Sequence, residues 1–192
     1  VDLRELLDPQ VIADTVARLQ RTAEERRARD AQDVDDLLRW LGPLSREAIA
    51  DRYAGDDDLD EILADLTGTG RLVTVTMRGG PRFVSIDDVA RLRDGLGIPA
   101  PLGVPSAYLG GTADPIGDLV HPYARTHGPF TADDAAEDLG MAVAVVRDAL
   151  VKLADRRRVI EGQYVLVDDD EAGQRSQFCH ADVLGQLRRG SL

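Results

Sequence analysis

Two segments of the chain carry the same pattern of residue types, 86 residues apart: "LGPLSREAIADRYAG" at 41–55 and "HGPFTADDAAEDLGM" at 127–141. Each has Gly-Pro, one apolar residue, one hydroxyl residue and then an acidic amphipathic stretch. A hydroxyl residue in that place is a typical helix N-cap. The repeat therefore predicts two copies of one structural module, which strongly limits the folds open to the chain.

The first copy has the order of a winged helix. Apolar residues recur at helical spacing from Val34 to Leu41, Gly42-Pro43 ends that helix, and Ser45 is expected to cap a second helix over 48–53. A third periodic stretch, 59–66, precedes two strands, 71–77 and 82–86, which are joined at Gly79-Gly80-Pro81. Three helices followed by a β-hairpin predict a winged-helix module.

The second copy repeats that order. A helix with inward-facing apolar residues over 116–123 comes first, and Thr131 with Asp134 then forms a capping box that starts the next helix. Leu150 in the third periodic stretch corresponds to Leu63 in the first copy. The segment "RRVIEGQYVLV" at 157–167 is expected to form a short hairpin that turns at Gly162.

These patterns predict a mainly α fold with small β-hairpins (α+β), built from tandem winged-helix (helix-turn-helix) modules. The expected boundaries are an N-terminal helical arm over 1–30, module 1 over 31–93, a Gly/Pro-rich connector over 94–114, and module 2 with a C-terminal helix over 115–192. Asp8-Pro9 should start the arm's helix. The charge run "ERRARD" at 25–30 is read as a solvated face.

Composition argues against strong nucleic-acid binding. The 192 residues include 35 acidic and 23 basic side chains, which gives a formal net charge of −12, whereas nucleic-acid binders are usually basic. A single cysteine, Cys179, suits a reducing compartment. No apolar run approaches the roughly 20 residues of a membrane span. These features predict a cytoplasmic protein. The chain starts at Val1 without Met and stops at "RRGSL", so we also expect it to be a piece of a longer polypeptide.

Motifs for catalysis or metal binding are weak. Asp56, Asp58 and Asp60 match the first positions of a calcium loop, but its essential glycine and final glutamate are missing. No phosphate-binding loop is present, and His121, His127, Cys179 and His180 lack zinc-ligand spacing. The prediction is no catalytic residue, no metal and no cofactor in this chain.

The third helix of each module also lacks the residues that read DNA bases. In module 1 it begins with acidic residues and in module 2 with Ala and Val, whereas base readout uses Arg, Lys, Asn or Gln. The remaining candidates could neutralise phosphates without reading sequence. A solvated basic edge is the alternative. These candidates are Lys152, Arg156, Arg157, Arg158, Arg188 and Arg189.

Several stretches resemble the bacterial large helicase-related proteins, Lhr. They are "VDLRELLDPQVIADTVARLQ" (1–20), "RRARDAQDVDDLLRWLGPLS" (26–45), "YARTHGPFTADDAAEDLGMAVAVVRDALVKLADRRRVIEGQY" (123–164) and "FCHADVLGQLRRGSL" (178–192). The chain departs from the family pattern before Cys179, where a tryptophan is common.

The resemblance implies part of the C-terminal extension of an ATP-dependent, 3′-to-5′ single-strand DNA translocase and helicase of DNA repair. ATP and Mg²⁺ would then be bound by motor domains outside this segment. The implied partners are other modules of the same polypeptide, further copies in a homo-oligomer, and single-stranded or duplex DNA bound nonspecifically, in the cytoplasm near the nucleoid and not at a membrane.

Two other functions stay open at this stage. A winged-helix DNA glycosylase of the AlkZ type would need a pocket carboxylate or glutamine facing a flipped base, and the sequence does not single one out. A winged-helix transcription regulator would need a basic recognition helix, and the acidic third helix of module 1 argues against it.

Overall fold

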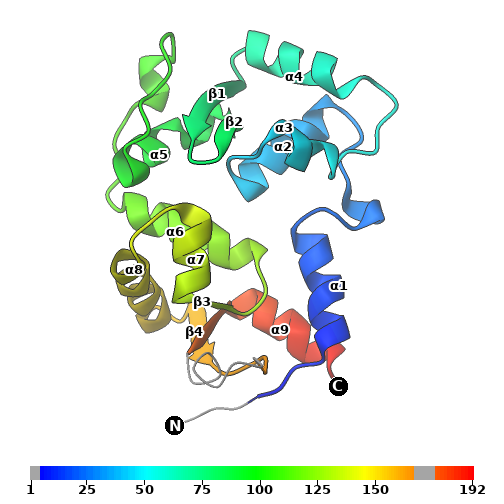
Figure 1. Cartoon of the computed structure of the whole chain (residues 1–192), viewed down its shortest axis with the longest axis vertical. Coiled ribbons are helices and arrows are strands. Elements are labelled where there is room, and N and C mark those ends of the chain that lie inside the picture. Colours follow the sequence, from blue (N-terminus) through cyan, green and yellow to red (C-terminus); the bar gives the residue numbers. More distant parts are fainter. Residues whose placement is uncertain (1–4, 167–175) are drawn as a thin grey trace. The chain divides into compact units, whose positions relative to one another are not determined.

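A computed structural model describes residues 5–166 and 176–192 of the chain (Figure 1). It divides into two compact units, one over Arg21–Leu119 and one that combines the segment up to Gln20 with Val120–Leu192. Both are mainly helical with a small antiparallel sheet, so the predicted fold class is confirmed. Among the described residues, no helix is both long and apolar enough to cross a bilayer.

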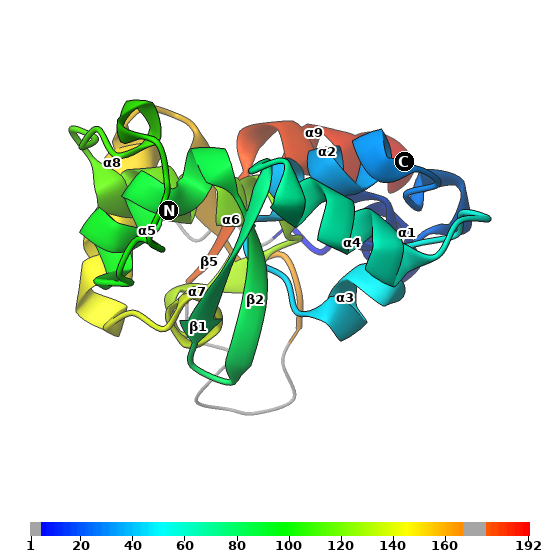
Figure 2. The ribbon, with the colours of Figure 1, turned by 90° about the horizontal axis from the view of Figure 1, so that it is seen from above.

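The unit over 21–119 follows the winged-helix order. After the short 3-10 helix η1 (Glu24–Arg26), helices α2, α3 and α4 precede the antiparallel β1–β2 hairpin, which Figure 2 shows along its length. Helix α5 and the 3-10 helices η2 and η3 follow the hairpin. The bounds are α2 Ala31–Leu41, α3 Arg46–Ala50, α4 Leu59–Gly68, β1 Leu72–Met77, β2 Gly80–Ser85, η2 Ile86–Asp88, α5 Val89–Leu96 and η3 Ser106–Tyr108.

Apolar side chains of α2, α3, α4 and β1 form the core of this unit. Val34, Leu38, Ile49 and Leu72 are fully buried there, and Val34 and Leu38 are positions that the helical periodicity predicted for α2. The positions predicted for α4 are buried as well: Leu59, Ile62, Leu63 and Leu66. Residues three and four apart lie on one side of a helix, so the apolar residues of α2 and those of α4 each form one buried face, and both faces belong to the same core.

The other unit has the same order around a three-stranded sheet, β3-β5-β4. Val120, Ala124, Val146, Leu150 and Leu184 are fully buried in its core. Its bounds are α1 Pro9–Leu19, α6 Pro115–Thr126 (which begins in the first unit), β3 Phe130–Thr131, α7 Ala132–Leu139, α8 Val143–Asp155, β4 Val159–Gly162, β5 Gln177–His180 and α9 Ala181–Gly190.

The predicted hairpin at Gly162 is wrong. Strand β4 pairs with β5 and not with the residues that follow Gly162, and Val167 lies outside the described residues. The backbone of 163–164 instead accepts hydrogen bonds from the N-terminal segment, at 3.1 Å from Glu5 N and 3.2 Å from Leu7 N. The amide of Gln177 bonds the backbone of Tyr164 and Val165, so these residues are held beside the sheet.

The repeated Gly-Pro corner has the same structure in both units. Leu44 exchanges two backbone hydrogen bonds with Phe83 of β2, and Phe130 pairs with Phe178 of β5. The next residue caps a helix in each case: the Ser45 and Thr131 hydroxyls accept backbone N–H bonds of 3.1 Å. The predicted caps, including the capping box at Thr131, are confirmed.

The N-terminal arm packs with the second copy. Asp8 caps α1 with Pro9 in the first turn, as predicted, and α1 contacts α9. Arg188 of α9 holds the carboxylate of Glu5 through two hydrogen bonds, at 2.8 and 2.7 Å. The compact units therefore begin and end at other residues than the four segments expected from the sequence. As functional domains, those four segments stay a prediction.

Candidate nucleic-acid interface

The start of α4, the helix that would read DNA in module 1, is negatively charged and therefore repels phosphate. Asp58 accepts N–H bonds from Asp60 and Glu61, which are themselves acidic and lie in the first helical turn. Asp60 forms a two-bond ion pair with Arg46, at 2.8 and 3.1 Å. The acidic residues thus serve as helix cap and ion-pair partner, and the described residues contain no cluster suited to a metal ion.

The basic end of α8 has an unusual backbone. Arg157 has a φ of +59°, in the left-handed region that favours glycine. The N–H groups of Arg157 and Arg158 bond the carbonyls of Ala154 and Leu153, at 2.9 Å each, which is the Schellman pattern of a helix C-terminus. An arginine therefore occupies the position that usually requires glycine.

Helix α4 ends in the same motif with a glycine at that position. Gly70 has a φ of +77°, and the N–H groups of Gly70 and Arg71 bond the carbonyls of Thr67 and Leu66. Gly70 and Arg71 thus correspond to Arg157 and Arg158. The second copy has exchanged an unstrained glycine for a strained, exposed arginine, and backbone strain of this kind is concentrated at functional sites.

The two copies also differ in how the following arginine is neutralised. In the first, the Arg71 guanidinium donates to the fully buried carboxylate of Asp35 at 3.1 Å. The residue at the position of Asp35 in the second copy is His121, 86 residues later. A carboxylate that balances the arginine in one module is thus replaced by an imidazole in the other.

His121 belongs to a histidine pair that sequence reasoning missed. Its Nε2 lies 3.1 Å from Nε2 of His180, and the rings stack. Nδ1 of His180 accepts a hydrogen bond from the backbone N–H of Asp182. In the neutral ring the proton is therefore on Nε2 of His180, which donates a hydrogen bond to Nε2 of His121. Burial most of all, then His121, Arg125 and Arg158, lower the pKa of His180, while Asp182 raises it.

The end of α8 therefore presents several positive charges with few internal partners. The side chains of Arg156, Arg157 and Arg158 are exposed, and within 5–166 and 176–192 no carboxylate lies within ion-pair distance of them. Lys152 pairs with Asp148 at 3.0 Å on the exposed face of α8. Pairs of this exposed kind are weak and leave the lysine able to exchange partners.

The structure separates Arg188 from this group. Its ion pair with Glu5 raises the pKa of Arg188 and lowers the pKa of Glu5, through the hydrogen bonds between them. Arg189 is exposed, and its Nη1 lies near Gly185 of its own helix. Of the six basic candidates, Arg156, Arg157 and Arg158 are the most available to an outside anion.

The first module has a second basic feature that the sequence reading left unused. Arg78 and Gly79 form the turn of the β1–β2 hairpin, and Arg82 follows two residues into β2. The Arg82 guanidinium bonds the carbonyl of Pro81 at 2.9 Å. Arginines on either side of a glycine turn were a visible signal for an exposed basic hairpin tip.

Comparison with known proteins agrees with this architecture. Residues 5–111 match the family model of the winged-helix domain of large helicase-related proteins. The chain is 45% identical over its whole length to an "Lhr helicase/ probable uracil glycosylase" of Mycolicibacterium smegmatis. It is 36% identical over 176 residues, 91% of the chain, to an "Lhr helicase/uracil glycosylase" of Escherichia coli. The chain spans only 12% and 11% of the lengths of these relatives.

Proposed function

Because this chain belongs to the large helicase-related family, we propose that it is a non-catalytic winged-helix segment that contacts the DNA backbone weakly and without reading sequence. The motor that binds ATP and Mg²⁺, and the repair activity, would lie in other parts of the polypeptide. Association with the nucleoid stays a prediction.

One observation carries the proposed DNA contact: at the end of the third helix, Arg157 stands where the first copy has Gly70. Arg157 keeps a backbone conformation that costs roughly 1 kcal/mol, so a gain outside the fold is the simplest reason for it. Two or three arginines neutralise only a few phosphates, and the net charge of −12 opposes approach. The expected dissociation constant is on the order of 10⁻⁴ M or weaker at physiological salt.

The test is fluorescence anisotropy of labelled single-stranded and duplex DNA across a salt series. We expect the logarithm of the affinity to fall with the logarithm of the salt concentration, with a slope of about −2 to −3, equally for unrelated sequences. Replacing Arg156 and Arg157 by Ala should remove most of the binding. The matched control replaces Arg46 and Arg93, which removes the same charge from surface ion pairs. Tight, sequence-dependent binding would contradict the proposal.

We further propose that the start of α8 faces protein, either another module or a second copy of the chain. Val145 is 41% exposed, beside the exposed Ala142 and Ala144, and such a surface offers no hydrogen bond to a base edge. Val145→Glu should reduce any self-association seen by sedimentation, whereas Val151→Glu, farther along the helix, is the control. Equal effects of both changes would argue against a contact at the helix start.

The names of the relatives favour a second function, uracil excision. The pocket that most resembles a base site has a volume of about 330 Å³ and is lined by Tyr123, His127, Phe130 and Asp138. However, the Tyr123 hydroxyl donates to Asp138 at 2.6 Å, and burial lowers the pKa of His127. We infer that excision belongs to another part of the polypeptide, so this chain should release no more uracil from DNA than its Asp138→Asn variant.

A further inference from the structure

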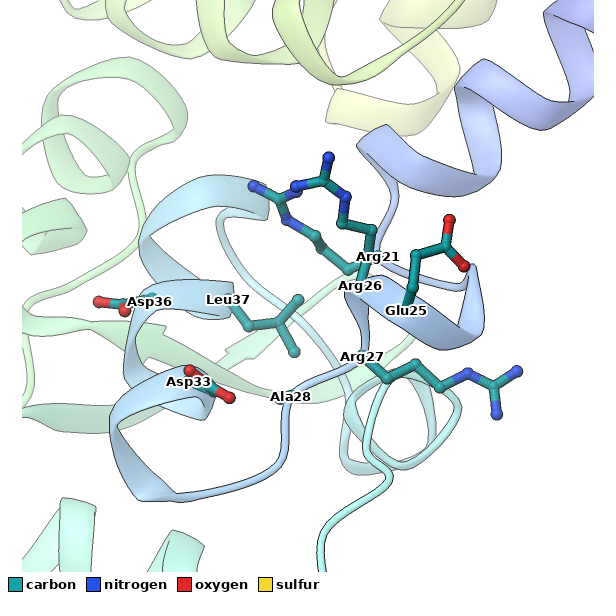
Figure 3. Close-up of a pocket in the computed structure, with 8 residues that line it drawn as sticks. All are labelled: Arg21, Glu25, Arg26, Arg27, Ala28, Asp33, Asp36 and Leu37. Carbon is teal, nitrogen blue, oxygen red and sulfur yellow. The ribbon is translucent and has the colours of Figure 1, made fainter.

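A second arginine-lined site lies within the unit over 21–119. A pocket of about 320 Å³ is formed by the loop after α1, by η1 and by one face of α2 (Figure 3). Three arginines line it, and two of them belong to the charge run at 25–30 that was expected to be a solvated face. They are Arg21, Arg26 and Arg27.

Two of these arginines stand close together without a carboxylate between them. Figure 3 shows the guanidinium groups of Arg21 and Arg26 next to each other, while the carboxylate of Glu25 lies on the other side. Burial, and the charge of Arg26 to a smaller degree, lower the pKa of Arg21. Two neighbouring guanidinium groups repel each other because both are positively charged, and a bound anion would relieve that repulsion.

Several arginines in the rest of the unit are paired with carboxylates, whereas Arg21 and Arg26, in the part of the chain that the structure describes, are not. The arginines that follow η1 include five with carboxylate partners: Arg39, Arg46, Arg71, Arg91 and Arg93. Within the described residues, neither Arg21 nor Arg26 has an ion pair. Arg78 and Arg82 also lack an ion pair in the described part of the chain, so the distinguishing feature of Arg21 and Arg26 is that they lie side by side in one pocket.

The backbone around the pair is fixed in advance. Arg21 has a φ of +60°, a left-handed conformation that is costly for a residue with a side chain. Its guanidinium lies over the ring of Trp40, 4.9 Å from the centroid. Arg27 Nε bonds the carbonyl of Thr22, and Ala28 is tied by two backbone bonds of 2.8 Å to Arg52 and Ala54. A fixed backbone and the Arg21–Trp40 contact reduce the entropy that is lost when a ligand binds.

We propose that Arg21 and Arg26 form a phosphate-binding site. Guanidinium groups bind phosphate oxygens with charge-assisted, often paired hydrogen bonds, and two of them can hold one phosphate group from two sides. The carboxylates of Asp33 and Asp36 on the other wall already bond Arg29 N and Gln32 Nε2, at 3.0 Å each. Because these carboxylates are bonded to groups of their own wall, an anion would bind at the opposite wall, where the arginines lie. This proposal does not depend on the α8 interface.

Trp40 is the only tryptophan of the chain and lies under Arg21, so its fluorescence can report binding directly. The 192-residue chain is titrated with inorganic pyrophosphate and, separately, with an oligothymidylate of about 15 nucleotides, with acetate at equal ionic strength as the blank. We expect a saturable change in Trp40 emission with at least one of the two phosphate ligands. A response to both identifies phosphate itself as sufficient, and a response to the oligonucleotide alone identifies a nucleic-acid backbone as the source.

Variants separate this site from others. Arg26→Gln leaves the Arg21–Trp40 contact in place and should weaken binding about tenfold. Arg21→Gly relieves the left-handed backbone, so lost binding there does not reflect unfolding, and labelled-oligonucleotide anisotropy or pyrophosphate calorimetry replaces the tryptophan signal. The charge-matched control, Arg46→Gln with Arg93→Gln, should bind as the wild type does. Absence of a saturable response to either ligand, or equal binding by wild type and Arg26→Gln, would overturn the proposal.

Discussion

Asp88 gives a sharp test of the energetics of the unit over 21–119. It is the last residue of η2, and its side chain is 10% exposed with Arg91 Nε 3.4 Å away. Burial is the largest effect on its pKa and raises it from 3.8 to about 6, although Arg91 and Arg39 act in the opposite direction. An unfolded chain would restore the ordinary value, so the folded form binds this proton more tightly.

The sign of the pH dependence follows from that difference. The contribution of Asp88 to stability is complete below about pH 4 and is lost as the pH rises toward 6, where the buried carboxyl ionises. Two pKa units correspond to about 3 kcal/mol. Of this, about 2 kcal/mol should be lost between pH of about 4.5 and about 7.5, where the fold can be measured.

The perturbation is Asp88→Asn, which keeps the shape and removes the titration. Urea unfolding followed by Trp40 fluorescence reports the same unit. Relative to wild type, the free energy of unfolding of the variant should rise by about 2 kcal/mol more at the higher pH than at the lower one. Asp65→Asn, an exposed residue of α4, is the control and should show no such change. A difference that does not vary with pH would refute the reasoning.

Two further predictions concern the other unit. Arg157→Gly should raise its free energy of unfolding by roughly 0.5 to 1 kcal/mol, measured by amide hydrogen exchange, and at the same time weaken DNA binding; a loss of stability would show that Arg157 is not strained. The lowered pKa of His180 predicts that stability present above about pH 6.5 is lost as the pH falls below that value, because the unfolded imidazole takes the proton more readily. His180→Gln should flatten this dependence. A free energy of unfolding that stays constant from pH of about 7.5 to 5, after the exchange rates are corrected for their intrinsic pH dependence, would contradict it.

Local features of the fold could be predicted from the sequence. The caps at Asp8, Ser45 and Thr131 each depend on a residue and the next two or three backbone N–H groups, so the pattern contains the whole interaction. The buried faces of α2, α4 and α8 followed from periodicity for the same reason. The Leu63–Leu150 correspondence joined two such local patterns, and these residues lie in α4 and α8.

Non-local features could not be predicted in this way. The partner of β4 is β5, which starts 15 residues after Gly162, whereas the sequence pattern favours pairing with the residues that follow directly. His121 and His180 are 59 residues apart and meet only because β5 and α6 pack together. The left-handed arginines gave no signal either, since glycine is the residue that marks this conformation in a sequence.

The path of the chain has a consequence for the order in which the protein folds. The unit over 21–119 is continuous and can fold as soon as it leaves the ribosome, because domains tend to fold as units during synthesis. The other unit needs Glu5 and Leu7 against residues made much later, Arg188 and Tyr164. The apolar face of α1 therefore stays uncovered until α9 has been synthesised, and the nascent polypeptide should be most exposed to chaperones in that interval.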